Sequence, residues 1–167
     1  IAKASVRHAL EMVENLPIKV ALSLSDPFCV ERHHQDFNEL IRSRVDLLFC
    51  NQEEAFTMME TQVTQEALAG LSENVETVVM TLGNRGSLIC NQGQIYYIDP
   101  IEVEVVDTTG AGDAYAAGFL YGFSHDQSIM NCGRIASVMA GTVIEQIGPR
   151  IETASMKTLK ERLSNIP

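Results

Sequence analysis

Apolar residues along the chain form short continuous runs that alternate with amphipathic stretches. The runs predict buried strands over residues 18–24, 45–50 and 76–82. Segments with apolar residues at helical spacing predict helices over residues 3–14, 31–43, 52–60 and 64–73. Strands that alternate with helices are typical of βαβ units, so we expect a mainly parallel sheet covered by helices on both faces.

The pattern changes after the third predicted strand. Residues 87–92 and 94–99 are short strand-like runs separated by Gly93, which predicts a small antiparallel meander. The stretch IEVEVV, residues 101–106, then predicts a further strand that leads into a glycine-rich turn. Helices are expected over residues 111–123, 127–146 and 154–163. Because no repeat or linker interrupts this order, residues 1–167 are expected to form a single α/β domain.

Charge and cysteine content narrow the classes of partner. The net charge of −10 argues against a nucleic-acid or anionic-membrane partner, although backbone N–H groups at a helix start could still bind a small anion. The four cysteines form no CxxC pair, which speaks against disulfides and zinc and predicts a reduced, cytoplasmic setting. No apolar run approaches the length of a membrane span.

The stretch DTTGAGD, residues 107–113, places small residues where a helix is predicted to begin. Gly110, Ala111 and Gly112 would let a ligand approach the backbone, and the free N–H groups of the helix start favour an anion. Asp113 would then be a general base that accepts a proton from a hydroxyl attacking a bound phosphoryl group. A purely structural alternative, in which Asp107 or Thr108 caps the helix, is equally compatible with these residues.

The longer stretch DTTGAGDAYAAGFL, residues 107–120, resembles the signature of the ribokinase and fructokinase-like (PfkB) family of carbohydrate and nucleoside kinases. The resemblance implies a ribokinase-like fold and transfer of the γ-phosphoryl group of ATP to a primary alcohol. It also implies that Asp113 is the catalytic base and that Gly110, Ala111 and Gly112 form the anion hole.

Asn51 and Glu54 directly follow the second predicted strand. Their spacing is typical of a capping box, in which Asn51 caps a helix and Glu54 reaches back to it. An Asn-x-x-Glu at this place in the PfkB family organises Mg²⁺ and phosphates through water. The resemblance therefore implies a magnesium role as well, and we expect both.

The same resemblance implies a role in nucleotide binding for two further segments. TLGNRG, residues 81–86, could be a simple hairpin turn, but in the family this loop lies along the nucleotide, which makes Thr81, Gly83 and Gly86 candidate ATP contacts. The helix over residues 127–146 would form one wall of the adenine pocket. Its small residues are equally explained by close packing.

The segments SLSDPF (23–28) and VDLLFCNQEEA (45–55) resemble the adenosine-kinase branch more than the sugar-kinase branch. The expected acceptor is therefore a nucleoside. The alternatives are a sugar kinase of ribokinase or fructokinase type and a non-catalytic nucleotide-binding regulatory module; a P-loop ATPase is disfavoured because GxxxxGK[ST] is absent from the sequence. A monovalent cation and a homodimer are compatible with the resemblance.

Only the C-terminal half of a family member is matched. We find no counterpart of the N-terminal part, with its first strands, Gly-Gly substrate motif, acceptor-binding aspartate and β lid. We therefore expect the chain to be the nucleotide-binding and catalytic half of a larger kinase, inactive by itself because the acceptor would not be positioned. Missing strands would also leave an apolar sheet edge that favours association.

Overall fold

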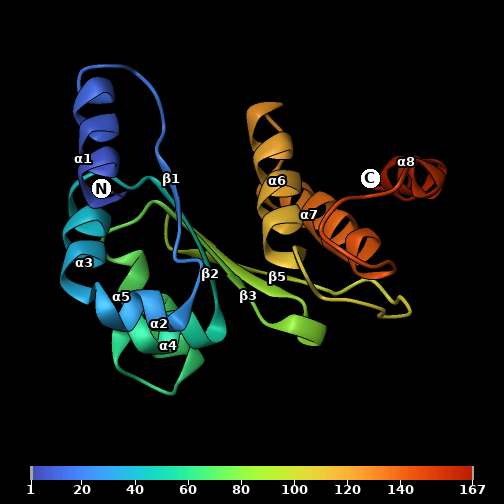
Figure 1. The fold of residues 1–167 in the computed structure, drawn as a ribbon, viewed down its shortest axis with the longest axis horizontal. Helices are drawn as coiled ribbons and strands as arrows, with labels where there is room; N and C mark the ends of the chain where they lie inside the picture. Colours follow the sequence, from blue (N-terminus) through green and yellow to red (C-terminus); the bar gives the residue numbers. More distant parts are fainter. Residues whose placement is uncertain (1, 167) are drawn as a thin grey trace.

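A computed structural model describes residues 2–166 (Figure 1). Within these residues one sheet has the strand order β1-β2-β3-β4-β5. Its strands are β1 (Ala21–Ser23), β2 (Leu47–Asn51), β3 (Thr77–Thr81), β4 (Ser87–Asn91) and β5 (Gln94–Ile98). The first three strands are parallel, and β4 and β5 follow in antiparallel pairing. The structure confirms both the parallel core of the sheet and the antiparallel meander.

Helices cover both faces of this sheet, as the alternation of elements predicted. They are α1 (Ala2–Val13), α2 (Pro27–Arg32), α3 (His34–Ser43), α4 (Gln52–Met59), α5 (Thr64–Ser72), α6 (Ala111–Ser124), α7 (Ile129–Ile144) and α8 (Met156–Ser164). Figure 1 shows α2 to α5 on one side and α6 with α7 on the other, while α1 stands beside α3. The two termini lie at opposite ends of the molecule.

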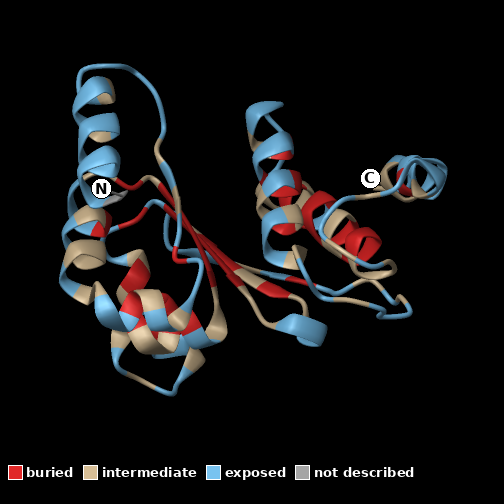
Figure 2. Ribbon diagram, in the orientation of Figure 1, coloured by how far each residue is buried: buried red, intermediate tan, exposed pale blue. Residues whose placement is uncertain are grey.

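Alternate side chains of the central strands build two apolar cores. Leu48 and Cys50 of β2 pack with α2, α4 and α5, whereas Leu47 and Phe49 point to the opposite face. There Phe49 meets Phe119 of α6 edge to face, with ring centroids 5.7 Å apart. Figure 2 shows buried residues following the central strands and the helix faces turned toward them. Both faces of β2 and β3 are covered, and this agrees with the apolar runs at residues 47–50 and 78–80.

The helix predicted over residues 31–43 is two helices. Helix α2 begins earlier because Pro27 occupies its first position and the Asp26 carboxylate accepts a hydrogen bond from Cys29 N at 3.0 Å. It ends at His33, where α3 begins. The N-cap signal in Asp-Pro was therefore present in the sequence.

The strand predicted over residues 101–106 is wrong. These residues join no strand, and the backbone N–H groups of Val106 and Asp107 donate instead to Ile144 O at the end of α7. The apolar-polar alternation arises because Ile101 and Val103 pack against α7 while the glutamates between them face solvent. Alternation of apolar and polar residues, which is typical of a strand, here results from the packing of an irregular segment against α7.

The first strand is shorter than predicted and lies at the edge of the sheet. Of residues 18–24, only Ala21–Ser23 form β1, which pairs with β2 alone. Ala21 and Ser23 are exposed, and so is nearby Ile18. Over residues 2–166, no helix is both long and apolar enough to cross a membrane.

Candidate active site

Polar side chains follow the parallel strands where their carboxyl ends meet. Asn51 ends β2 and lies directly opposite Thr81, the last residue of β3, in the strand register. Ser23 ends β1 next to them. In open α/β sheets this edge is where ligands bind. The predicted magnesium and nucleotide segments are therefore brought together by the parallel pairing.

The expected capping box at the start of α4 is confirmed. Asn51 Oδ1 accepts from Glu54 N at 2.8 Å, and Glu54 Oε2 accepts from Asn51 N at 2.9 Å. A third bond joins Asn51 Nδ2 to Glu54 Oε1 at 2.8 Å. Glu54 is 5% exposed, and burial raises the pKa of its carboxyl, with further increases from Asp26 and Glu53. A buried carboxylate among other acids is a place that favours a cation.

The glycine-rich turn starts α6 without a side-chain cap. Gly110 is the N-cap residue, with φ 80°, and neither Asp107 nor Thr108 caps the helix. Asp107 accepts from Thr109 N and Oγ1 and from Gly148 N, and these bonds, the Thr109 side chain first, lower the pKa of its carboxyl. The capping alternative for Asp107 and Thr108 is therefore wrong. These residues shape the turn instead.

The uncapped start leaves backbone donors free. Ala111 N donates to Thr108 O at 3.1 Å, whereas the N–H groups of Gly112 and Asp113 have no acceptor within the described part of the chain. Both N–H groups lie in the first turn, where the helix dipole is positive. The Asp113 side chain in that turn is exposed. The turn thus offers donors for an anion beside a carboxylate.

The two glycines of the turn are needed for different reasons. A Cβ on Gly110 would lie 2.5 Å from Pro149 Cβ, and its φ angle of 80° is one that other residues rarely adopt. A Cβ on Gly112 would meet nothing within 4 Å. Gly110 is therefore explained by the fold, whereas the space beside Gly112 is open to a ligand.

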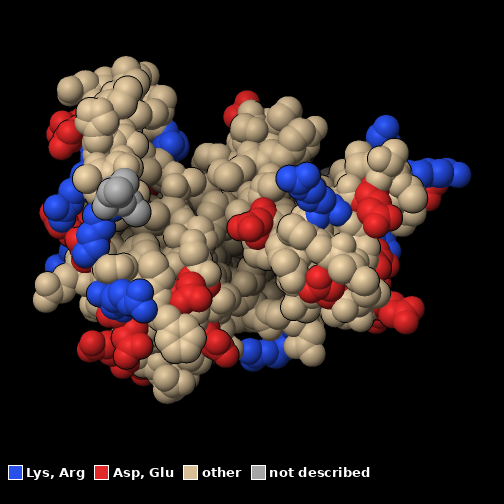
Figure 3. Space-filling view, in the orientation of Figure 1, with Lys and Arg blue, Asp and Glu red and all other residues tan. Residues whose placement is uncertain are grey.

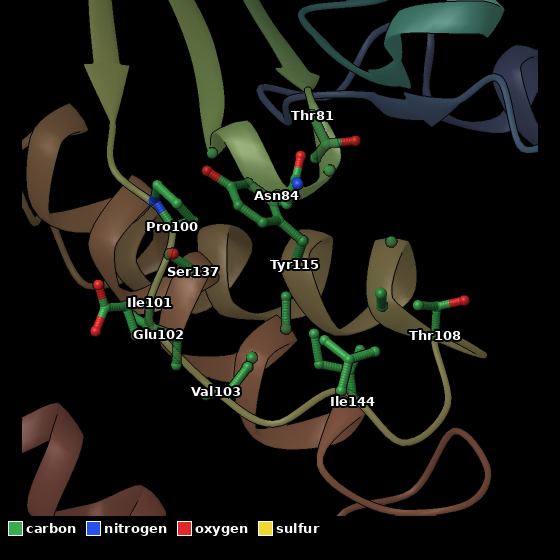
Figure 4. A pocket seen from close by; sticks show the side chains of 17 residues that line it. Thr81, Asn84, Pro100, Ile101, Glu102, Val103, Thr108, Tyr115, Ser137 and Ile144 are labelled. Atoms are coloured by element: carbon green, nitrogen blue, oxygen red, sulfur yellow. The ribbon is translucent and has the colours of Figure 1, made fainter.

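A cavity of about 650 Å³ lies between this turn, the loop after β3 and α7 (Figure 4). Thr81, Gly83 and Gly86 line it from the strand side. Ala111 and Gly112 line it from α6, and residues 137–144 of α7 contribute to the opposite wall. Its volume is in the range of small-molecule sites. The helix expected to border an adenine pocket does border this cavity.

A second cavity of about 340 Å³ lies next to the first, because Thr81, Gly112 and Tyr115 line both. It collects Asp113, Asn51 and Glu54. All the predicted site residues except Gly110 therefore line one or both cavities. Among the described residues, no Lys or Arg side chain lines the smaller cavity. Its charged groups are carboxylates only.

The loop from Thr81 to Gly86 is also the predicted hairpin turn between β3 and β4. Gly83 and Gly86 have positive φ angles, and a Cβ on Gly86 would lie 2.0 Å from Ile98 O, whereas one on Gly83 would meet no atom within 4 Å. Arg85 in this loop donates to Gln52 Oε1 at 2.7 Å. Its guanidinium therefore braces the loop against α4.

Sequence reasoning missed three hydroxyl-bearing residues of the smaller cavity: Tyr115, Ser23 and Ser25. Tyr115 extends from α6 toward the strands (Figure 4) and shares a 2.5 Å hydrogen bond with Ser87 of β4. Burial raises the pKa of Tyr115 to about 12, so its hydroxyl stays protonated. The two serines could have been predicted from the sequence, because polar residues at the carboxyl end of a parallel strand lie at the edge of the sheet where ligands bind.

Charged side chains are scattered over the face shown in Figure 3. Lys and Arg form no broad patch there, and the surface is hollowed between the two groups of helices. Only Asp and Glu contribute charge to the cavity lined by Asp113.

Solved structures share this open α/β fold closely. The chain superimposes on a probable sugar kinase from Rhizobium etli with a TM-score of 0.90 and 36% identity, over 96% of this chain and 49% of that one. It superimposes on the adenosine kinase of Sinorhizobium meliloti with a TM-score of 0.90 and 37% identity, over 96% and 50%. The fold is therefore ribokinase-like.

The family follows from the sequence comparison. Residues 1–155 match the pfkB family carbohydrate kinase, so the chain belongs to that family. An uncharacterized sugar kinase of Archaeoglobus fulgidus is 32% identical over 72% of this chain and 48% of its own length. The adenosine kinase of Dictyostelium discoideum is 27% identical over 80% and 43%. The chain thus spans about half the length of these relatives.

Proposed function

We propose that the protein is an ATP-dependent kinase that transfers the γ-phosphoryl group to a primary alcohol of a nucleoside. The observation that carries this proposal is the pair of adjacent cavities, one bordered by α7 and large enough for a nucleoside, the other lined by Asp113. Family membership supports the reaction class. Gly112 is one of the residues that line both cavities, which supports a role for the glycine turn in contacting the phosphate chain.

Asp113 is the general base of this proposal. It is an exposed carboxylate in the first turn of α6, beside the free N–H groups of the turn. Phosphoryl transfer has a loose transition state, so the acceptor proton leaves late and the position of the base matters more than its basicity. The turn from Gly110 to Gly112 would stabilise the charge that develops on the transferring group.

Mg²⁺ fits the smaller cavity through Asn51 and Glu54. Carboxylate oxygens are its preferred ligands, and it keeps most of its waters while sharing phosphates. The carboxyl groups of Glu54 and Asp113 and the absence of Lys and Arg among the described residues of this cavity favour a cation there. When bound, Mg²⁺ would neutralise phosphate charge. Glu54 would hold hydrated Mg²⁺ with the carboxylate that also closes the capping box.

ATP binding is assigned to the larger cavity. Thr81, Gly83 and Gly86 would contact the nucleotide from the loop side, and α7 would face the base. The cavity is apolar near Ile144 and Val103, which suits one face of a purine. The complete protein is proposed to be cytoplasmic, with a small-molecule acceptor and no nucleic-acid or membrane partner; a monovalent cation and a homodimer are compatible with this assignment.

A nucleoside is the proposed acceptor because segments 23–28 and 45–55 resemble the adenosine-kinase branch and a solved adenosine kinase is 37% identical. Relatives named as sugar kinases make a sugar the second candidate. The deciding experiment offers labelled ATP and Mg²⁺ to the full-length protein with adenosine, guanosine, ribose or fructose. Transfer to adenosine or guanosine supports the proposal. Transfer to ribose or fructose alone establishes the sugar kinase, and ATP binding without transfer to any of the four favours a regulatory module.

A further inference from the structure

One backbone conformation in this structure is not explained by the fold. The described residues other than glycine with positive φ angles are Ser25, Glu60, Gln92 and Asp126. Glu60 caps the C-terminus of α4, Gln92 shares the tight β4–β5 turn with Gly93, and Asp126 follows the end of α6. These are places where a left-handed residue is ordinary. Ser25, with φ 67°, lies at none of them.

The strain at Ser25 is held by its neighbours. Asp26 N donates to Leu24 O at 2.8 Å, which closes a three-residue turn around Ser25 with the rare positive φ angle. On one side Leu24 is fully buried and donates to Phe49 O at 3.0 Å. On the other side Asp26 accepts from Cys29 N at the start of α2. Strained residues fixed in this way are concentrated at functional sites.

Ser25 lines the 340 Å³ cavity together with Asp113, Asn51 and Glu54. Its hydroxyl has one long contact, to Ser23 O at 3.4 Å. Its backbone N–H has no acceptor among residues 2–166. The strained turn therefore leaves two donors of one exposed residue available at the cavity that holds the proposed base.

The charge of the cavity defines what these donors suit. The cavity contains carboxylates and no Lys or Arg from the described chain, so a phosphoryl group there depends on neutral donors in addition to a cation. Gly112 N supplies one such donor from α6. One of the two N–H groups of the Asn51 side-chain amide is already used on Glu54. On the β1 side, Ser23 and Ser25 are the described lining residues with a hydroxyl, and Ser25 adds a backbone N–H without an acceptor in the described chain.

We propose that Ser25 binds the transferring phosphoryl group, with its hydroxyl and backbone N–H donating to oxygens of that group. This inference rests on the proposed function, because it assigns a residue to the γ-phosphoryl group of ATP. The γ-turn would then have a function: it would hold the hydroxyl and the backbone N–H of Ser25 at the cavity.

The test compares nucleotides that differ only in the γ-phosphoryl group. Calorimetric titration of the full-length protein with MgATP and MgADP gives both affinities for the wild type, for Ser25→Ala and for Ser25→Gly. Loss of a hydrogen bond to a charged group predicts an ATP affinity about tenfold lower or more in Ser25→Ala. The ADP affinity should stay within about twofold. Ser25→Gly should also raise Tm, because glycine adopts the positive φ angle without strain.

Glu60→Gly is the matched control, since it relieves a positive φ angle at a residue that lines neither cavity. It should raise Tm and leave both affinities unchanged. Equal losses for ATP and ADP in Ser25→Ala would show a merely structural role, and unchanged affinities would remove any role; either result overturns the inference while the kinase proposal stands. A wild-type protein that binds no ATP would overturn both.

Discussion

Replacing Gly112 with alanine should separate ligand access from stability. Gly112 lies in the first turn of α6, and a Cβ there would meet no protein atom within 4 Å. A Gly→Ala change at a compatible position stabilises a protein by about 0.4–1 kcal/mol, mainly through the unfolded chain. For a protein of this size, that corresponds to a Tm increase of about 1–4 °C. The variant is therefore expected to be slightly more stable than the wild type.

Nucleotide affinity should change in the opposite direction. The added methyl group would project into the space shared by both cavities, where a phosphate would approach Gly112 N. Loss of one hydrogen bond to a charged group is worth about 1.5–3 kcal/mol. This predicts an affinity for MgATP about 10- to 150-fold weaker. Thermal unfolding and calorimetric titration of the same preparation measure both effects.

Two neighbouring glycines are the controls. Gly148→Ala, with φ 85° and no clash, should lower stability by about 1–2 kcal/mol through the left-handed backbone alone. Gly110→Ala adds a 2.5 Å contact with Pro149 Cβ and should be the least stable of the three. Normal ATP affinity in Gly112→Ala, together with its raised Tm, would refute the argument that a ligand approaches this backbone.

Three further perturbations test the supports of the site. Glu54→Gln keeps a side chain that can complete the capping box, so it should weaken the Mg²⁺ dependence of turnover with little loss of stability. Glu54→Ala should in addition lower the free energy of unfolding by about 0.5–2 kcal/mol. Equal Mg²⁺ titrations of wild type and Glu54→Gln would contradict the metal role. Tyr115→Phe leaves the buried Ser87 hydroxyl without its partner and should lower stability by about 1–3 kcal/mol in denaturant titrations, so an unchanged midpoint would count against that bond. Asp107→Ala should lower Tm most at neutral pH, because hydrogen bonds depress the pKa of the Asp107 carboxyl in the folded protein. The stabilisation by this carboxylate is present above the ordinary carboxyl pKa and is lost as pH falls through the depressed value. A Tm difference between wild type and Asp107→Ala that grows on acidification would contradict this sign.

The central part of the fold was readable from the sequence because burial on both faces imposes continuous apolar runs. Strands β2 and β3 were predicted correctly for this reason, and Gly93 between two short strand-like runs indicated the antiparallel meander. Residues 101–106 were misread because packing against α7 gives the same alternation as a half-buried strand. Periodicity reports which side chains are covered, and it does not report what covers them.

The site was predictable where the chemistry is local in sequence. Asn51 and Glu54 are three residues apart, and the glycine turn is adjacent to Asp113, so their spacing carries the signal. Ser25 could not be found in this way, because its strained backbone and its place beside Asp113 depend on how β1 and α6 meet in space. The reason for Gly110 was hidden as well, since Pro149 is distant in sequence.

The most direct test of Asp113 as the general base is phosphoryl transfer from labelled ATP by the full-length protein, measured for the wild type and for Asp113→Asn. Asparagine keeps the size of the side chain and removes its ability to accept the acceptor proton. We expect the wild type to transfer phosphate to a nucleoside. In Asp113→Asn, kcat should fall about 10²- to 10⁴-fold while the affinity for MgATP is retained. Transfer by Asp113→Asn at the wild-type rate would contradict the assignment of Asp113 as the base.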